Sequence, residues 1–436
     1  MHEKRRYVKL AWIGLASAVA LALPSPGGAE IVAPTLGRGF LAVGPDGSPR
    51  VAFFSGRDVV VARRVTSGWT FAGRGQLLTG NGVIEGLVVD GKARTSLLVA
   101  AEDGSWLAFA DRGRKLRIVA RPRRGASFGP AGLALDAADR PAFAYAVRLR
   151  TGKTYLRLVT TDIRGRLRTR AITKQGFPSS VLAPGAAPVL VRGRLHVVET
   201  YSSAAIDWQP QPKGRWVGQY LFASRAGSPA GRVGAVADGG TLWSGWTQAS
   251  SGSVSVLLTL SAATQETNTI LDHGIFVSLL VDAGRPEVGA YDWVQLGDWF
   301  GYAGVLADES GPFTEVDGLI EGYVAAPGGR RQLLLSTNNG LEWFEAPARP
   351  SIRVSLSAEP TGKLKGRVEG ASGGLVHVYR EAPNGPRTLI ANAELAPDGS
   401  FTAEAAPPAS PTFYRAVYVE QATAIPYASL LRTAVG

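Results

Sequence analysis

Leu41-Ala-Val-Gly-Pro-Asp-Gly-Ser-Pro-Arg-Val-Ala-Phe-Phe54 consists of an apolar run, a turn centred on Asp46-Gly47 and a second apolar run. An Asp-Gly pair between two such runs is typical of a tight hairpin that joins antiparallel strands. Two more turns follow, at Ser55-Gly56 and Ser67-Gly68. We therefore expect one antiparallel sheet, with strands at 40–43, 50–54, 58–64 and 69–72.

The same unit of apolar run, turn and apolar run occurs seven times along the chain. Its turn centres lie near Gly47, Gly91, Asp139, Gly193, Gly239, Gly284 and Gly328, at intervals of 44, 48, 54, 46, 45 and 44 residues. One four-stranded sheet cannot bury both of its faces, whereas seven sheets stacked around an axis can. We therefore predict an all-β chain that begins with a seven-bladed β-propeller.

The last unit has room for only three strands, at 321–326, 331–336 and 341–345. Residues 31–36 form an additional apolar segment before the first unit. Because an open ring would leave a strand edge unpaired, we expect this segment to supply the missing fourth strand. The ring would then close between the two ends of the repeat region.

Three segments share an Asp- or Gly-led turn, a proline and a Val-Ala-Tyr-like strand: Asp46-Gly-Ser-Pro-Arg-Val-Ala-Phe, Asp139-Arg-Pro-Ala-Phe-Ala-Tyr and Gly284-Arg-Pro-Glu-Val-Gly-Ala-Tyr. Through them, residues from about 31 to 347 resemble secreted bacterial seven-bladed β-propellers. Ser336-Thr-Asn-Asn-Gly-Leu-Glu-Trp343 also resembles the Asp-box of sialidases and of many non-enzymatic propellers, with Asn338 where Asp is usual. Since an Asp-box is a structural turn, it supports the propeller fold and says almost nothing about catalysis. The resemblance is to the non-catalytic type of Asp-box or sialidase-like propeller.

Residues 349–436 have a different pattern of seven short strands, at 352–356, 364–368, 375–379, 388–395, 400–405, 413–419 and 428–431. This number and length fit an antiparallel β-sandwich. Pro397-Asp-Gly-Ser-Phe401 and Tyr414-Arg-Ala-Val-Tyr418 resemble a turn and a late strand of immunoglobulin-like or fibronectin type III-like domains. We expect a propeller at 30–348 and a small sandwich at 349–436, which the resemblance implies is a spacer or binding accessory.

Residues 1–29 have a basic start, an apolar stretch of 14 residues and small residues before Glu30. This pattern predicts a signal peptide that is cleaved after Ala29. An uncleaved anchor is the alternative, although a spanning helix needs about 20 residues. Cleavage lowers the formal net charge from +12 to +9, and the chain has no cysteine for disulfides or thiolate sites. We expect a secreted, extracellular or periplasmic monomer without an integral membrane segment.

Catalytic and metal-binding patterns are scarce. Beyond His2, the histidines are His196, His273 and His377, and none has the spacing of a metal site, so we expect neither metal nor cofactor. The chain has no G-x-S-x-G elbow, and it lacks the early Phe/Tyr-Arg-Ile-Pro motif of sialidases. Paired carboxylates of a glycoside hydrolase could come from Asp292, Asp298, Asp308, Glu309 and Glu315, but loop carboxylates are more often solvated surface.

Aromatic residues gather in the fourth to sixth units, beside carboxylates. The candidate ligand-binding residues follow the second strand of the fourth and sixth units, and they are Tyr201, Asp207, Trp208, Tyr291, Asp292, Trp293, Asp298 and Trp299. Aromatic rings stack on the apolar faces of sugars while carboxylates orient hydroxyl groups. Equivalent positions in two units would place both groups on one side of the ring. Alternatively, the tryptophans fill the space between blades.

Charge is distributed unevenly along the chain. Residues 111–170 hold 16 Lys or Arg and 4 Asp or Glu, whereas 266–321 hold 1 Arg and 11 Asp or Glu. The basic sector suits an anionic surface polymer, although an arginine-rich composition could serve solubility alone, and nucleic acid is not expected outside the cell. We predict an exported, non-catalytic binding or scaffold protein for a glycan or an anionic cell-surface polymer. The alternative is a carbohydrate-active hydrolase or lyase.

Overall fold

The computed structural model describes residues 29–436 except 35–37, 78–80, 174–176, 179–183, 202–203, 224–227, 251–252, 261–266, 297–298, 347, 382–386, 408–411, 430–431 and 435–436. The predicted signal peptide, apart from Ala29, lies outside the described residues. Regular structure in the described part is β-strand except for a short 3-10 turn at Pro212–Gly214, which confirms the all-β prediction. Within the same part, no helix is long and apolar enough to cross a membrane.

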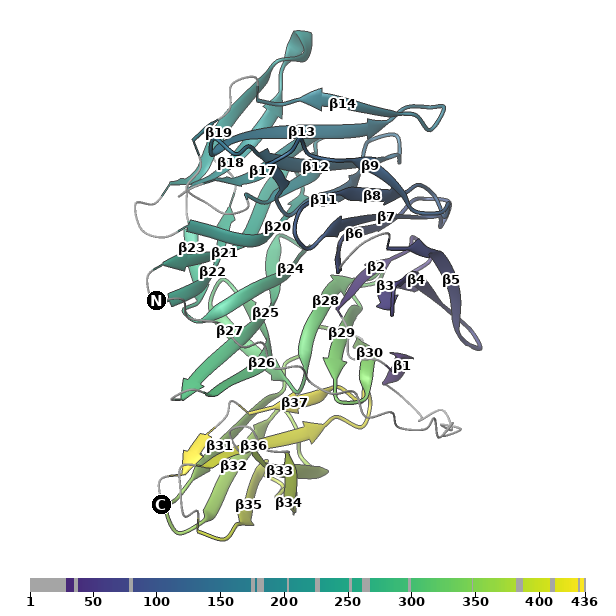
Figure 1. Ribbon diagram of the computed structural model, residues 1–436. Helices are drawn as coiled ribbons and strands as arrows, with labels where there is room; N and C mark the ends of the chain where they lie inside the picture. The colour runs from purple at the N-terminus through teal and green to yellow at the C-terminus, as the bar shows by residue number, and fades with distance from the viewer. Residues whose placement is uncertain are drawn as a thin grey trace, which may run out of the picture.

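The described strands between residues 30 and 346 form seven antiparallel sheets (Figure 1). The first contains β2 (Gly39–Val43), β3 (Pro49–Ser55), β4 (Asp58–Val65) and β5 (Gly68–Gln76). The second contains β6 (Gly82–Val89), β7 (Thr95–Ala101), β8 (Leu107–Ala110) and β9 (Arg117–Ala120). The third contains β10 (Ser127–Phe128), β11 (Gly132–Leu135), β12 (Pro141–Arg148), β13 (Lys153–Thr161), β14 (Leu167–Ala171) and β15 (Phe177–Pro178).

In the remaining four sheets, the strand named first is the innermost and the strand named last is the outermost. The fourth contains β16 (Ala186–Val191), β17 (Arg194–Tyr201), β18 (Ala204–Pro210) and β19 (Trp216–Ala223). The fifth contains β20 (Ser228–Asp238), β21 (Thr241–Ser250), β22 (Ser253–Leu260) and β23 (Thr267–Leu271). The sixth contains β24 (Gly274–Asp282), β25 (Arg285–Leu296), β26 (Trp299–Asp308) and β27 (Gly311–Val316). The seventh contains β28 (Leu319–Ala325), β29 (Arg331–Thr337), β30 (Gly340–Ala346) and β1 (Glu30–Ala33).

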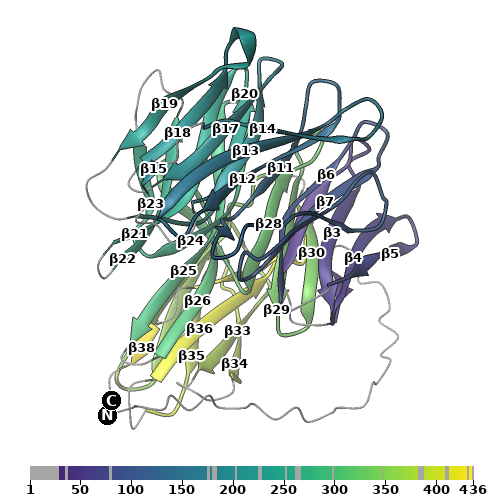
Figure 2. The same cartoon turned by 45° about the horizontal axis from the view of Figure 1, so that its top comes forward.

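The inner strands of these sheets contact one another in a closed cycle, from β2 through β6, β11, β16, β20, β24 and β28 back to β2. Figure 2 labels β6, β11, β24 and β28 near the middle of the view. Each interface between neighbouring sheets holds a cluster of buried apolar side chains. Leu97 packs toward the first sheet and Leu98 toward the third, because successive side chains of a strand point to opposite faces. The chain is therefore of propeller type, with every sheet buried on both faces.

The strand expected to complete the seventh sheet is confirmed for Glu30–Ala33. β1 pairs antiparallel with β30, with Glu30 opposite Trp343 and Ala33 opposite Leu341. Val32 is buried among side chains of the first and seventh sheets. The N-terminal strand thus joins the two ends of the repeat region.

The C-terminal strands form two sheets that pack against the sixth and seventh sheets. One contains β31 (Arg353–Ala358), β32 (Lys363–Glu369) and β35 (Ser400–Glu404). The other contains β33 (Leu375–Glu381), β34 (Thr388–Glu394), β36 (Thr412–Val419), β37 (Pro426–Ala428) and β38 (Arg432–Ala434). Of the strand predicted at 428–431, Ala428 ends β37 and Ser429 is not in a strand, while residues 430–431 lie outside the described part of the chain.

The second C-terminal sheet continues the outer edge of the sixth sheet. Val316 in β27 pairs with Tyr427 in β37, and Asp317 forms ion pairs with Arg387 at 2.8 Å and Arg415 at 3.2 Å. One hydrophobic cluster contains side chains from both regions. The C-terminal strands therefore cover an edge that would otherwise be free to pair with another chain.

Candidate functional site

An Ile-Glu-Gly sequence occurs in the inner strands of the second and seventh sheets. In β6, pairing with β7 shifts between Ile84 and Gly86, and in β28 pairing with β29 shifts between Ile320 and Gly322. The extra residue of each bulge is a glutamate, Glu85 or Glu321. A β-bulge breaks the alternation of a strand and re-aims the inserted side chain.

The glycines of these two sequences allow the next inner strand to approach closely. An added Cβ on Gly86 would lie 2.5 Å from the Cβ of Leu133, and one on Gly322 would lie 2.6 Å from the Cβ of Leu41. A larger residue would therefore push the neighbouring sheet away. The Ile-Glu-Gly pattern thus combines tight packing around the ring with an inserted acidic side chain.

Two other inner strands also have bulges. The bulged residues of all four strands line one cavity, which is described below. Pairing between β20 and β21 shifts between Ala230 and Val233, which includes Arg232. Pairing between β24 and β25 shifts between Phe276 and Ser278, which includes Val277. Because four separate sheets contribute bulges, the cavity belongs to the ring and to no single sheet.

The cavity has a volume of about 370 Å³. Its lining includes Arg38, Glu85, Arg232, Ile275, Tyr291 and Glu321. These residues come from the segment before β2 and from β6, β20, β24, β25 and β28. Since most of these strands are the innermost of their sheets, the cavity lies at the centre of the ring.

Glu321 accepts two hydrogen bonds at this centre. The amide of Gly39 donates to Oε2 at 3.2 Å, and the hydroxyl of Tyr291 donates to Oε1 at 3.5 Å. Burial raises the pKa of Glu321 from its ordinary value of 4.5 to about 7, against the opposing effects of the Gly39 amide, Arg38 and Arg232. Burial and the neighbouring Glu321 also raise the pKa of Tyr291.

Glu85 has a similar environment on the second sheet. Burial raises its pKa to about 7, and Arg232, the amide of Ala131 and Arg38 oppose the shift. Both glutamates are only 8% exposed. A carboxyl group with a pKa near neutrality can act as a hydrogen-bond donor or as an acceptor.

Two guanidinium groups accompany the glutamates. Arg232 donates from Nη2 to the carbonyl of Ile84 at 2.5 Å, and its guanidinium carbon lies 4.9 Å from the ring centroid of Phe40. Arg38 is exposed at the start of the first sheet. Within the part of the chain that the structure describes, neither arginine forms an ion pair. Both charges act on Glu85 and Glu321, where they oppose the rise in pKa, and an anion in the cavity would lie in the same positive field.

The buried glutamates should make folding stability depend on pH. Glu85, Glu199 and Glu321 all have a pKa of about 7 in the folded chain, against 4.5 in an unfolded chain. Between these values the folded state holds more protons, so this contribution to stability is fully present below pH 4.5 and is lost as pH rises through about 7. Each carboxyl contributes about 3 kcal/mol to this change.

We expect Glu85→Gln to reduce the decrease in the free energy of unfolding between about pH 5 and pH 8. Urea unfolding at several pH values measures this decrease. Glu102→Gln, which changes an exposed neighbour on the cavity rim, is the control and should leave the slope as it is in the unmodified chain. An unchanged slope in Glu85→Gln would show that folding does not raise the pKa of this carboxyl.

The structure places Asp207 and Trp208 inside the fourth sheet, in β18. Trp208 is 8% exposed and donates from Nε1 to Oε2 of Glu199 at 2.9 Å. Asp207 lies 3.1 Å from Nδ1 of His196 and accepts from Gln209 at 2.9 Å. This burial favours the alternative interpretation, in which the tryptophan fills the space between sheets.

Of the other expected residues, Tyr291 reaches the central cavity from β25. Asp292 follows it and is partly buried. Tyr201 ends β17, Trp293 lies in β25 and Trp299 begins β26, but their side chains lie outside the described residues, as does all of Asp298. Both groups run from the second strand into the third strand of their sheets, with Tyr201 and Tyr291 on second strands and Trp208 and Trp299 on third strands. Their placement on one side of the ring stays a prediction.

Sequence reasoning missed Arg38, Glu85, Arg232 and Glu321. The repeated Ile-Glu-Gly at 84–86 and 320–322 is a signal that could have identified both glutamates.

Asp308, considered above for a hydrolase, forms an ion pair with Arg349 at 2.5 Å and so attaches the C-terminal strands. Among the residues that the structure describes, no three His, Asp or Glu side chains gather closely enough to hold a metal ion.

No protein-family model and no curated protein matches this chain. Among solved structures, it is similar to an ulvan lyase from a new family of polysaccharide lyases, at 12% identity and a TM-score of 0.43, covering 64% of this chain and 80% of that one. It is similar to AofleA from Arthrobotrys oligospora at 12% identity and a TM-score of 0.40, covering 63% and 86%. A puromycin hydrolase gives 13% identity and a TM-score of 0.41, covering 78% and 56%. At these values the similarities bear on neither ligand nor reaction.

Proposed function

We propose that this chain is an exported, monomeric and non-catalytic binding protein, which takes a sugar unit with a carboxylate group into the central cavity. The scaffold would be a seven-bladed β-propeller at 30–348 of the Asp-box type, followed by an immunoglobulin-like or fibronectin type III-like sandwich at 349–436. Seven sheets and a closed cycle of inner-strand contacts in the described part support the propeller. The two C-terminal sheets support the sandwich.

One observation carries the proposed function: Arg38 and Arg232, which form no ion pair among the residues that the structure describes, line a cavity that also contains Glu85, Glu321 and Tyr291. Its volume of about 370 Å³ lies within the range of small-molecule sites. Arginine binds a carboxylate with paired, charge-assisted hydrogen bonds. Neutral carboxyl groups and a tyrosine hydroxyl can donate to the same ligand, and Ile275, which is 40% exposed, offers an apolar contact to a sugar ring.

We expect Arg232→Ala to weaken binding of uronic acid oligosaccharides by at least about tenfold, because it removes a charge-assisted contact. Isothermal titration against oligogalacturonates and against neutral oligosaccharides measures this effect. Affinity for the acidic ligands should also fall as pH rises through about 7, because ionised Glu85 and Glu321 repel the carboxylate.

Arg57→Ala is the matched control, since Arg57 is exposed on the turn between β3 and β4. It should bind as the unmodified chain does. Equal affinity for acidic and neutral oligosaccharides, or an Arg232→Ala variant that binds normally, would contradict a carboxylate ligand at this cavity.

A hydrolase or lyase is the second candidate, because the hydroxyl of Tyr291 contacts Glu321, whose pKa lies near 7. A carboxyl group with this pKa suits general acid or base catalysis. Release of reducing ends or of unsaturated sugars from a panel of acidic polysaccharides, lost in Tyr291→Phe, would favour catalysis over binding alone.

A further inference from the structure

In the second and third sheets, the turns after β6, β8 and β13 each begin with an aspartate, which is Asp90, Asp111 or Asp162. Asp90 Oδ1 accepts from the amides of Lys92 at 3.1 Å and Arg94 at 2.9 Å. Asp162 Oδ1 accepts from the amides of Arg164 and Arg166, both at 2.9 Å. Turn amides therefore hold these carboxylates, and the arginines that follow them project from rigid turns.

Three such turns surround a second cavity of about 260 Å³. They connect β6 with β7, β8 with β9, and β13 with β14. The lining includes Arg94, Asp111, Arg112, Arg114, Ile163 and Arg164. Asp90 follows the last residue of β6, whereas Glu85 of the central cavity lies within that strand, so the two cavities are separate.

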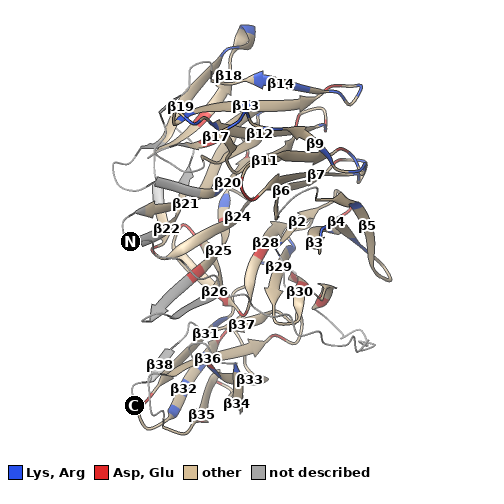
Figure 3. Cartoon of the chain, in the orientation of Figure 1, with Lys and Arg blue, Asp and Glu red and all other residues tan. Residues whose placement is uncertain are grey.

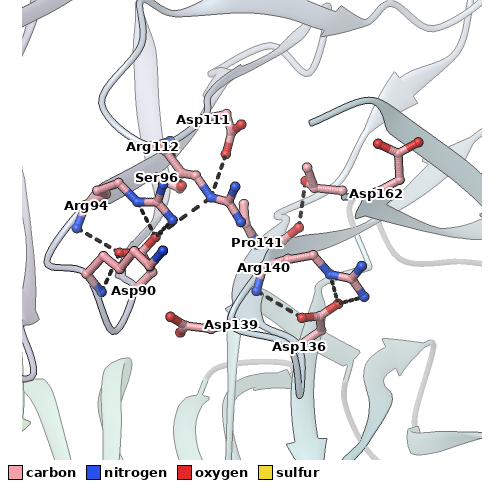
Figure 4. Close-up of polar contacts among 12 residues, drawn as sticks. Asp90, Arg94, Ser96, Asp111, Arg112, Asp136, Asp139, Arg140, Pro141 and Asp162 are labelled. Atoms are coloured by element: carbon pink, nitrogen blue, oxygen red, sulfur yellow. Dashed lines mark hydrogen bonds and ion pairs between the residues drawn. The ribbon is translucent and has the colours of Figure 1, made fainter. Parts of the chain in front are cut away.

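Beside this cavity Asp90 is paired with Arg94, and Asp111 lies at the limit of ion-pair distance from Arg112 (Figure 4). Asp90 Oδ2 lies 2.6 Å from Nη2 of Arg94 and 3.7 Å from Nε of Arg112. Asp111 Oδ1 lies 3.9 Å from Nε of Arg112. Two carboxylates thus accompany two of the four guanidinium groups that line the cavity.

Arg114 and Arg164 supply positive charge that is not balanced in this way. Both are exposed, and neither has an ion pair within the described ranges of the chain. An added Cβ on Gly165 would lie 3.7 Å from Oδ2 of Asp111 and 3.9 Å from Nη1 of Arg114, so the turn between β13 and β14 reaches the arginine of the neighbouring sheet.

The surroundings of this cavity are also basic. Figure 3 shows blue on β14 and on the turns near it, and residues 111–170 hold 16 Lys or Arg against 4 Asp or Glu. Ile163 is 86% exposed at the rim, which leaves an apolar contact beside the guanidinium groups. A positive surface attracts anionic polymers.

We propose that this cavity binds a tetrahedral oxyanion, a sulfate or phosphate group carried on an anionic polymer. Arg114 and Arg164 stand on two different turns beside Arg94 and Arg112, so positively charged donors line the cavity from three turns. A sulfate ester offers three terminal oxygens and a phosphate within a chain offers two, in tetrahedral directions that guanidinium groups on several turns can reach. This inference goes beyond the proposed function, because it assigns a second site whose residues are separate from the central cavity.

The test compares two double variants with the same loss of charge. Arg114→Ala with Arg164→Ala removes both unbalanced guanidinium groups, and Arg57→Ala with Arg285→Ala removes two exposed arginines on the first and sixth sheets. Binding of dextran sulfate, polyphosphate, polygalacturonate and neutral dextran is measured by isothermal titration at low ionic strength. Thermal unfolding of each variant verifies that it is folded.

We expect the first double variant to lose at least about tenfold in affinity for dextran sulfate or polyphosphate, and the second to stay within about twofold of the unmodified chain. The two polymers distinguish a sulfated from a phosphorylated ligand. Equal losses in both variants would reveal a response to net charge alone and would overturn the proposal. It would also be overturned if polygalacturonate bound as tightly as the sulfated and phosphorylated polymers, or if the first variant bound normally.

Discussion

A chain that begins at Pro34 should be less stable than one that begins at Glu30 by at least about 4 kcal/mol, and it should associate. The shortened chain lacks β1, so it loses the buried side chain of Val32 and the ladder to β30. Burial of a valine contributes about 2 kcal/mol and each hydrogen bond about 1 kcal/mol. The bidentate ion pair between Arg64 and Glu30, with a contact of 2.6 Å, is lost as well.

Removal of β1 also uncovers the edge of β30. Unpaired strand edges are templates for association, and here the exposed strand carries Trp343, which is 3% exposed in the intact fold. Urea unfolding measures the loss of stability, and size-exclusion chromatography with light scattering measures association.

Ile31→Ser is the matched control, because Ile31 belongs to the same strand but is 51% exposed. Its effect on the free energy of unfolding should stay below about 1 kcal/mol. If the chain that begins at Pro34 unfolds at the same urea concentration as the longer one, ring closure does not depend on this strand.

Arg331→Met should destabilise the fold by about 3–5 kcal/mol, because it leaves a buried carboxylate without its partner. Arg331 and Glu287 are 4% and 3% exposed, and they form two contacts at 3.0 and 3.1 Å between the seventh and sixth sheets. The hydroxyl of Tyr323 also donates to Glu287 at 2.6 Å. Urea unfolding of the variant measures the effect.

The adjacent residue provides the control for this prediction. Arg330 pairs with Glu345 at 2.8 Å, but the two side chains are 40% and 28% exposed. Arg330→Met should therefore cost less than about 1 kcal/mol. A second substitution, Glu287→Gln in the Arg331→Met background, should restore part of the lost stability by removing the unpaired charge. Equal effects of the two arginine substitutions would show that the buried pair does not hold the sheets together.

The strands of each sheet could be predicted because their signals are local. Turn residues such as Asp46-Gly47 and the alternation of apolar side chains lie within a few residues of one another. The strand predicted at 321–326 corresponds to β28 at Leu319–Ala325, and that at 388–395 to β34 at Thr388–Glu394. Closure by the N-terminal strand followed from counting strands in the last unit.

The candidate site was mostly missed because it depends on departures from the regular pattern. Trp208 and Tyr291 were both predicted as ligand-binding residues because aromatic and acidic residues gather around them in the sequence. Trp208 packs between sheets, whereas Tyr291 lines the central cavity. Glu85 and Glu321 resembled ordinary charged residues of strands. Only the register shifts of β6 and β28 show that these side chains are inserted residues.

From the sequence alone came the repeated four-stranded unit, the closing strand and the change of strand pattern after residue 348, since each depends on neighbours along the chain. Only the tertiary structure decided which polar groups meet at the ring centre and how the C-terminal strands attach to β27. The amide of Gly39 and the carboxylate of Glu321 are 282 residues apart in sequence and 3.2 Å apart in space. Such a contact depends on bulges and on closure of the ring, which no local spacing of residues specifies.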